Sequence, residues 1–227
     1  MNILALESAA LSAGAAVLED GILKSEQFVN SGLTHSQTLL PLVDAALAGA
    51  GKTVADMDAI AVSAGPGSFT GVRIGMGLAK GLALGAGKPV ICVPTLLALA
   101  FNVSAFPGEI VPIMDARRGE VYTATYRWEN GRMKEVRPMR AMPLSEVLEE
   151  VDKAIFVGDG VSVHRAAISA AKGECAQFAP AHLCYARAAS VAMAALSIEP
   201  VSPHAASPFY LRLSQAEREY MEKEKHQ

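Results

Sequence analysis

The stretch GPGSFTGVRIG, residues 65–75, has the composition of an anion-binding loop. It follows a buried apolar run and precedes a helical pattern. A helix that begins there offers free backbone N–H groups and the positive end of its dipole. The P-loop pattern ends in Gly-Lys-Ser/Thr, whereas Val72 and Arg73 follow Gly71 here, and the glycine spacing also differs from the dinucleotide motif. The stretch therefore favours a tight turn over a phosphate site.

Carboxylates, histidines and serines form no complete catalytic set. Glu7 and Asp115 each end an apolar run, and two carboxylates facing one cleft could hold a hydrated magnesium ion. This is the weaker interpretation, because the following residues lack the glycines of a phosphate hairpin. His35 is expected to be a capping or surface residue, and the chain has no HxxxH or HExxH motif. Ser8 and Ser68 have no histidine and carboxylate near them in sequence to suggest a triad.

Composition and charge indicate a folded globular chain. Of the 227 residues, 51% are hydrophobic and 19% charged. The net charge of −3 gives no electrostatic basis for tight nucleic-acid binding by the chain alone. Three cysteines without a CxxC pair indicate free thiols in a reducing compartment. The start lacks the basic region of a secretory signal, and Pro94 divides the longest uncharged stretch, so we expect a soluble, cytoplasmic protein.

Apolar periodicity predicts alternating strands and helices. The expected strands of the first half cover residues 3–6, 15–18, 22–29 and 89–93, with a further strand, DAIAVSAG, before the glycine loop. The expected helices cover residues 35–49, 71–87 and 95–106. Thr34 and Gln37 have capping-box spacing at the start of the first helix, and Pro41 should kink it.

Two of these helices carry faces that favour a close neighbour. The first has an apolar stripe that includes Leu39, Leu42, Val43 and Ala46. The second has two rows of small residues four apart, Gly71, Gly75 and Ala79 in one and Gly77, Gly81 and Gly85 in the other. An interior glycine costs a helix roughly 1 kcal/mol, so these rows indicate close approach of another backbone, within the chain or in a partner. Arg73 lies at the unfavourable end of the helix dipole, and we expect it to meet a carboxylate or phosphate.

The second half of the chain repeats the first in outline. Its run VPIMDARRGEVYTATYRWENG, like NILALESAALSAGAAVLEDG, reads as a strand, an acidic residue, a turn, a strand and a hairpin. Glu7 and Asp115 correspond at an offset of about 108 residues, which predicts a duplicated α/β unit. We therefore expect one subdomain at residues 1–106, a second at 107–213 and a charged helical tail at 214–227.

Five segments together resemble the TsaB (YeaZ) family of tRNA threonylcarbamoyladenosine biosynthesis proteins. They are LALESA, HSQTLLPLV, GPGSFTGVRIGMGLAKGLALG, DARRGEVYTATY and SPFYLR, and the similarity runs from residue 1 to about 213. The resemblance implies the duplicated fold of actin, the sugar kinases and Hsp70, with two similar α/β subdomains. It agrees with the internal repeat.

The resemblance further implies a non-catalytic role. The catalytic relative, TsaD, has an HxxxH metal motif at the positions of Thr95 and Leu99, which do not ligate metals, so we expect no bound zinc or iron. TsaB-like proteins bind TsaD through the helices expected here at 35–49 and 71–87. The residues expected to form that interface are Leu39, Leu42, Val43, Ala46, Gly71, Arg73, Gly77, Gly81 and Gly85.

The same resemblance implies a larger complex that includes the ATPase TsaE. This complex transfers threonylcarbamoyl, from an adenylate made by TsaC or Sua5, to the adenosine beside the anticodon in tRNAs that read ANN codons. We expect the chain to contact tRNA only through the complex and to hold no firmly bound cofactor. A homodimer of the free chain through the same helices, and ATP or ADP at the complex interface, are left open.

The alternative function is a nucleotide-dependent phosphotransferase of the same fold, with Glu7 and Asp115 on a metal and residues 65–71 on phosphate. A vestigial form of that site would consist of Glu7, Ser8, Gly65, Gly67, Ser68 and Asp115. A third reading, a metallopeptidase-like glycoprotease, is disfavoured by the absent HxxxH motif.

Overall fold

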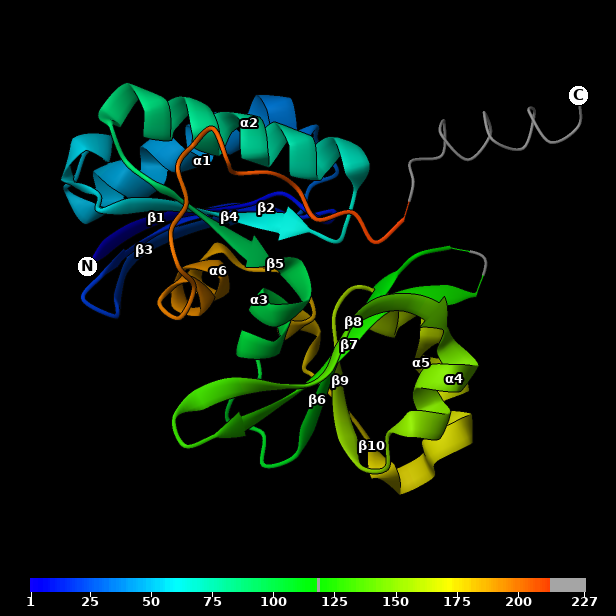
Figure 1. Cartoon of the computed structure of the whole chain (residues 1–227). Helices are drawn as coiled ribbons and strands as arrows, with labels where there is room; N and C mark the ends of the chain where they lie inside the picture. Colours follow the sequence, from blue (N-terminus) through cyan, green and yellow to red (C-terminus); the bar gives the residue numbers. More distant parts are fainter. Residues whose placement is uncertain (118, 213–227) are drawn as a thin grey trace, which may run out of the picture.

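Two five-stranded sheets, each with its own helices, make up the computed structural model, which describes residues 1–117 and 119–212 (Figure 1). The elements of the first half are β1 (Asn2–Glu7), β2 (Ala13–Glu19), β3 (Ile22–Val29), α1 (His35–Ala50), β4 (Ala59–Gly65), α2 (Phe69–Ala86), β5 (Val90–Pro94) and α3 (Thr95–Phe101). Those of the second half are β6 (Glu109–Asp115), β7 (Glu120–Glu129), β8 (Arg132–Pro143), α4 (Leu144–Glu150), β9 (Ala154–Val157), α5 (Gly160–Lys172), β10 (Ala176–Phe178) and α6 (Ala188–Ala195). Three short 3-10 helices complete the described chain.

The two sheets have the same topology. The first has the order β3-β2-β1-β4-β5, and the second, read from its other edge, has the order β8-β7-β6-β9-β10. In each, the hairpin strands pair antiparallel and the later strands add in parallel. Glu7 and Asp115 end the corresponding strands β1 and β6. This correspondence confirms the predicted duplication.

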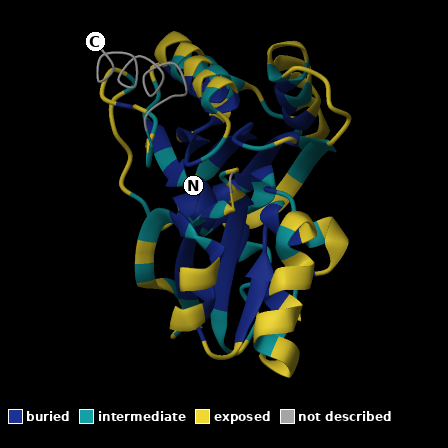
Figure 2. Ribbon diagram, turned by 90° about the vertical axis from the view of Figure 1, so that its right-hand side faces the viewer, coloured by how far each residue is buried: buried dark blue, intermediate teal, exposed yellow. Residues whose placement is uncertain are grey.

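The central strands are buried on both faces, because helices cover each sheet on two sides. Figure 2 shows these strands dark blue, and helices that expose residues on their outer faces. The apolar composition of the run at Ile3 to Leu6 fits this position, since both of its alternating faces must be apolar. On one side of the first sheet, α1 and α2 pack over β1, β2 and β4.

The helices α3 and α6 connect the two halves. α6 contacts all five strands of the first sheet although it follows the second sheet in sequence. Leu96 and Leu99 of α3 pack in the core of the second half, whereas Ala98 packs in the first. The first sheet ends at Pro94 and the second begins at Glu109, but α6, which follows the second sheet in sequence, lies with the first half. Sequence periodicity did not predict α4 or α6.

Residues 201–212 form a strap that returns along the first half (Figure 1). The strap begins with a bridge between Val201 and Val90 of β5. Farther along, Lys80 of α2 donates to the carbonyl of Ala206, and the N–H of Phe209 donates to Ala64 of β4. Arg212 then contacts Ala116 and Glu120 of the second half. The strap thus joins α2 to the second half.

Local details differ from the sequence predictions at two helices. Thr34 and Gln37 do not form a capping box, since the side chain of Thr34 makes no capping hydrogen bond; such a box forms instead between Thr53 and Asp56. α3 ends at Phe101, earlier than predicted, and a turn follows. The predicted tail helix at 214–227 lies outside the described residues. No helix among the described residues is both long and apolar enough to cross a membrane.

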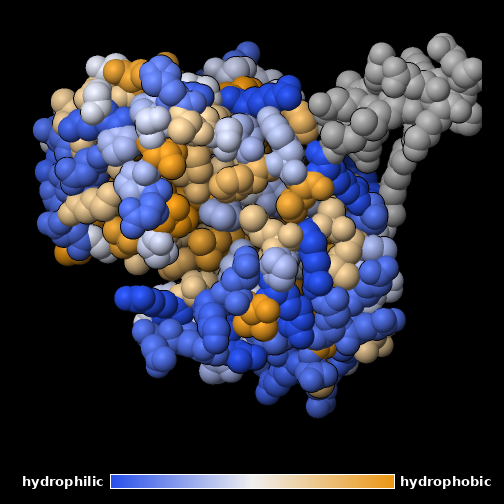
Figure 3. Space-filling model, in the orientation of Figure 1, coloured by the Kyte–Doolittle hydropathy of each residue, from blue (hydrophilic) through white to orange (hydrophobic). Residues whose placement is uncertain are grey.

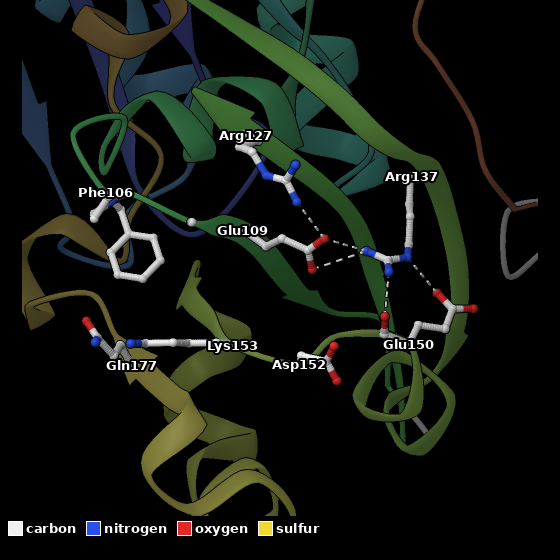
Figure 4. A pocket seen from close by; sticks show the side chains of 10 residues that line it. Phe106, Glu109, Arg127, Arg137, Glu150, Asp152, Lys153 and Gln177 are labelled. Carbon is white, nitrogen blue, oxygen red and sulfur yellow. Dashed lines mark hydrogen bonds and ion pairs between the residues drawn. The ribbon is translucent and has the colours of Figure 1, made fainter. Parts of the chain in front are cut away.

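A charged cavity of about 380 Å³ lies at one end of the second sheet (Figure 4). Its polar wall is an ion-pair network in which Glu109 accepts from both Arg127 and Arg137. Arg137 also donates to the carbonyl of Glu150. The network fastens the long ribbon β7–β8 to β6 and α4.

Candidate functional site

The glycine loop after β4 is packed against its own chain. The N–H of Ser68 donates to the carbonyl of Ala9 at 2.7 Å. A Cβ at Gly67 would overlap that same carbonyl, and one at Gly65, whose φ is +114°, would overlap the carbonyl of Phe209. The glycines thus allow the β1–β2 connection and the strap to approach the loop. This geometry accounts for the tight turn without an anion.

The inner row of small residues on α2 serves internal packing. The hydroxyl of Ser8 donates to the carbonyl of Gly71 at 2.9 Å. A Cβ on Gly71 would overlap the carbonyl of Ser8, and a Cβ on Gly75 would overlap its Oγ. Ala79, the third member of the row, is fully buried. Gly71 therefore contacts this chain and does not form part of an exposed face.

The outer row has a different environment. Gly77, Gly81 and Gly85 are exposed, and a Cβ on any of them would meet no described atom within 4 Å other than the adjoining backbone of α2. Leu84, on the same side of the helix, is 51% exposed. No contact with the described part of the chain explains why this face has three interior glycines, each of which weakens a helix.

α1 contributes fewer exposed residues than its apolar stripe suggested. Leu39, Val43 and Ala46 lie in the core over the first sheet, with at most 1% of their surface exposed. Leu42 is half-buried against the same core. The expectation that the first three contact a partner does not hold in this structure, because their own sheet covers them. The larger exposed apolar residues of α1 are Leu40 and Pro41.

His35 begins α1 and faces inward. One ring nitrogen, Nε2, lies 2.8 Å from the carbonyl oxygen of Ala10. A Cβ on Gly71 would lie 3.0 Å from the ring, so the imidazole packs beside α2. The residue is a tertiary contact between the β1–β2 connection and two helices, neither a helix cap nor an exposed side chain.

Arg73 forms an aromatic cluster at the start of α2. Its guanidinium carbon lies 4.3 Å from the centroid of the Phe69 ring and 5.7 Å from that of Tyr210. Its Nε donates to the hydroxyl of Tyr210 at 3.0 Å, and the two rings stack at 4.4 Å. No carboxylate of the described residues pairs with Arg73, so the expected contact with a carboxylate or phosphate is not made within this part of the chain. Sequence reasoning missed Tyr210 because it lies 137 positions away, although SPFYLR was already part of the family resemblance.

Glu7 is fully buried at the end of β1. Its carboxylate accepts hydrogen bonds from the hydroxyl of Ser63 and, at 2.6 Å, from the N–H of Ala9. Burial raises the pKa of Glu7 to about 7, against the effect of these hydrogen bonds. Both carboxylate oxygens therefore accept hydrogen bonds from residues of the first half.

Asp115 occupies the corresponding place in the second half but is more exposed. Its carboxylate accepts from the N–H of Arg117 at 3.1 Å and lies 3.5 Å from Nε2 of His164. Burial raises the pKa of the neighbouring Asp159 carboxyl. Within residues 1–117 and 119–212, no three His, Cys, Asp or Glu side chains are grouped so that they could hold a metal ion.

The positions expected to correspond to the TsaD metal ligands lie in α3. Thr95 begins this helix and Leu99 follows one turn later, and both are buried. Leu99 packs in the core of the second half. The hydroxyl of Thr95 has no hydrogen-bond partner among the described residues. This turn of α3 therefore joins the two halves through apolar packing.

The fold and these sites define the class of protein. Two solved structures share the fold: component A of the Acidaminococcus fermentans (R)-2-hydroxyglutaryl-CoA dehydratase (TM-score 0.52, 12% identity, 87% of this chain and 97% of that one) and the ethanolamine utilization protein EutJ of Carboxydothermus hydrogenoformans (TM-score 0.53, 13% identity, 85% of this chain and 90% of that one). Both belong to the actin-like ATPase fold, here built from two similar α/β units. The model of the tRNA N6-adenosine threonylcarbamoyltransferase family, TsaD, matches residues 30–220.

Particular relatives then identify the family. The chain is 35% identical to the tRNA threonylcarbamoyladenosine biosynthesis protein TsaB of Bacillus subtilis, over 99% of this chain and 100% of that protein. It is 43% identical to the Escherichia coli TsaB over 58% of each chain. YeaZ from Pseudomonas aeruginosa superposes with a TM-score of 0.79 at 28% identity, covering 92% of this chain and 99% of that one. The chain belongs to the TsaB (YeaZ) family.

Proposed function

We propose that the protein takes part in forming threonylcarbamoyladenosine in tRNA, as a non-catalytic subunit that binds and activates a TsaD-like transferase. The first part of this proposal rests on the biosynthetic role that the names of the B. subtilis and E. coli relatives state. The TsaD family model also matches most of the chain, so subunit and partner would be related proteins. The site of action would be cytoplasmic, where tRNA is modified.

The observation that carries the partner role is the exposed glycine row of α2. The outer face of α2 has three glycines beside the exposed Leu84, namely Gly77, Gly81 and Gly85. No described atom outside the helix packs against them. Small residues four apart allow two helices to pack in near contact. A partner helix seated on this face would explain a glycine content that the isolated helix does not need.

The partner surface that we propose differs from the one expected from sequence. It consists of Leu40, Pro41, Arg73, Gly77, Gly81, Leu84 and Gly85, supported from beneath by Leu39, Val43 and Ala46. The first half, which bears this surface, is also the more apolar half in the view of Figure 3, where much of the second half is hydrophilic. A second copy of the chain could use the same surface when the partner is absent.

The test is reconstitution with purified proteins. The chain would be combined with a TsaD-like subunit, a TsaE-like ATPase, the threonylcarbamoyl-adenylate and a tRNA that reads ANN codons. Modified adenosine would be measured by mass spectrometry of digested tRNA. We expect product only when both the chain and the TsaD-like subunit are present. Equal product without this chain, or product with the chain in place of the TsaD-like subunit, would refute the proposed role.

Nucleotide binding distinguishes the proposed role from the alternative one. The proposed role requires no nucleotide in this chain itself, and ATP or ADP at the interface with the partner stays a prediction. Titration calorimetry with ATP and magnesium, first on the chain alone and then on its complex, would separate this role from that of a phosphotransferase. Tight binding by the chain alone would favour the phosphotransferase.

A further inference from the structure

We infer that Arg73 is a preformed receptor for a carboxylate side chain of the protein that docks on α2, and that Tyr210 of the strap positions it. The inference rests on the proposed function, because it assigns a specific contact to the proposed partner surface. It adds the strap, residues 201–212, to the two helices from which that surface was expected.

One edge of the Arg73 guanidinium is hydrogen-bonded within the chain, whereas its two terminal nitrogens are not. Its plane is near both aromatic rings, and Nε is occupied by the hydroxyl of Tyr210 at 3.0 Å. A guanidinium has five N–H donors, of which four belong to the two terminal nitrogens. These four have no acceptor among residues 1–117 and 119–212. The two terminal nitrogens form the fork that binds a carboxylate through two parallel hydrogen bonds.

The strap fixes the position of this fork. Phe209, next to Tyr210, donates its N–H to Ala64 at 2.6 Å, and Lys80 holds the carbonyl of Ala206 at 3.0 Å. Tyr210 therefore stacks on Phe69 from a segment that is bonded on both β4 and α2. A side chain already held in its binding geometry loses less conformational entropy when the ligand arrives.

Charge favours a protein carboxylate over the phosphates of RNA. The exposed neighbours of Arg73 along α2 are Thr70, Gly77, Gly81 and Leu84, which carry no charge. The nearest other cation of α2, Lys80, is directed to the strap. Tight binding of nucleic acid requires several phosphates to be neutralised together, and a single free arginine on the exposed side of α2 does not provide this. A single aspartate or glutamate matches a single guanidinium.

The dipole of α2 also favours a negatively charged partner group at this position. Arg73 lies in the first turns of α2, where the positive end of the dipole opposes a cation. An incoming carboxylate would interact favourably with both the guanidinium and this helix end. The exposed aromatic and arginine side chains also have the composition of energetically important contacts at protein interfaces.

The experiment measures affinity for a purified TsaD-like protein by calorimetry at low and high salt. We expect Arg73→Ala to weaken binding at least tenfold at low salt and less at high salt. Arg73→Lys should also weaken binding, because an ammonium keeps the charge but lacks the fork. Tyr210→Phe keeps the stacked ring and removes the acceptor of Nε, so we expect a loss of a few-fold.

The matched control is Arg165→Ala. Arg165 of α5 also lies over an aromatic ring, 4.1 Å from the centroid of Phe178, but in the second half. The Arg165→Ala variant should bind the partner with the same affinity as the unchanged chain. Melting temperatures of all variants would show that each is folded. Replacing the acidic residues of the partner one by one with arginine should reveal one position that restores binding to Arg73→Glu.

The outcomes separate this inference from the proposed function. If Gly81→Leu abolishes partner binding while Arg73→Ala leaves the affinity unchanged, the carboxylate receptor is refuted and the partner surface stands. If Arg73→Ala weakens binding of tRNA to the assembled complex but leaves partner affinity unchanged, the arginine contacts phosphate and the inference is also refuted. If the unchanged chain does not bind the partner, the proposed function itself fails.

Discussion

Glu7 shows how burial controls the chemistry of a single residue in this protein. A carboxylate that bordered an open cleft could bind a cation, but this one lies beneath the surface and accepts from Ser63 and Ala9. Its pKa of about 7 results from the loss of hydration, which disfavours the charged form. The sequence identified the residue as special, whereas its enclosure depends on tertiary packing.

Replacing Glu7 should change stability in a pH-dependent way. In the unfolded chain the carboxyl ionises near its ordinary value of 4.5, and in the folded chain near 7. The folded state therefore binds more protons between these values, and the free energy of unfolding falls as pH rises through this window. Glu7→Gln removes the buried charge and should raise stability at pH 8 by up to about 3 kcal/mol, with little gain at pH 4.

Urea unfolding at pH 4 and pH 8 measures this difference. Glu146→Gln, at an exposed position of α4, is the control for removing one negative charge. A gain for Glu7→Gln that is the same at both pH values would show that ionisation of this carboxyl is not its cause. A loss at pH 8 would show that the charged carboxylate stabilises the fold.

The two glycine rows show what residue spacing reveals. A period of four places Gly71 with Gly75, and Gly77 with Gly81, so the sequence correctly gave two rows. The spacing did not orient the rows, because glycine and alanine fit a buried and an exposed helix face equally well. Tertiary contacts with Ser8, His35 and Val62 determine that the first row faces inward.

At the scale of elements, α2 and the strap depend on each other. Local periodicity predicted the helix nearly to its ends, since amphipathic spacing is a local property. The strap has no regular secondary structure over most of its length, and its contacts span more than a hundred residues. Such contacts have no periodic trace, so the aromatic cluster of the site could not be derived from sequence.

Gly81→Leu tests the outer face of α2. No described atom lies within 4 Å of the new Cβ, and leucine is better in a helix than glycine by roughly 1 kcal/mol. The monomer should therefore keep or raise its melting temperature. At an interface the added bulk should cost about 1–3 kcal/mol, which is roughly tenfold or more in affinity for a TsaD-like protein.

Melting curves would be recorded on dilute protein, because self-association through the same face would alter the melting temperature. Two further variants serve as controls. The Gly75→Leu variant should be less stable than the unchanged chain, because the new side chain would overlap Ser8. Ala170→Leu adds an exposed leucine to α5, away from α2, and should not change partner affinity. Full partner affinity of Gly81→Leu would show that this face is not the binding surface.

The ribbon β7–β8 depends on the network around Glu109. The Glu109 side chain is 15% exposed and accepts from Arg127 and Arg137, so Glu109→Gln would leave two guanidinium groups without this partner. We expect a loss of about 1 kcal/mol in the free energy of unfolding, since ion pairs near the surface contribute little. Glu129→Gln, at a more exposed member of the same network, should cost less.

Thermal unfolding followed by tryptophan fluorescence suits this test, because Trp128 is the sole tryptophan and lies on β7. Its ring packs edge-on against Phe101 of α3, with centroids 5.9 Å apart. Equal losses for the two variants would show that the arginine pairing at Glu109 has no special weight.

At the scale of the whole molecule, the repeat made the architecture predictable. Two copies of one strand order must form two similar sheets, and the acidic residues at equivalent strand ends gave the offset. The placement of α6 was not predictable, because its alanine-rich sequence fits several apolar surfaces equally well. Its position is determined by packing on the first sheet, which lies far from α6 in the sequence.

The charge of the whole chain leads to the last prediction, which concerns tRNA. Affinity for RNA arises largely from neutralised phosphates, and the chain has 20 lysines and arginines against 23 acidic residues. Many of the arginines of the second half are also paired with glutamates. We therefore expect the chain alone to bind tRNA more weakly than about 1 μM near 150 mM salt, and the assembled complex to bind more tightly because its other subunits supply cations. Filter binding of labelled tRNA at several salt concentrations measures both. Sub-micromolar binding by the chain alone would contradict this prediction and would indicate that the chain contacts tRNA directly.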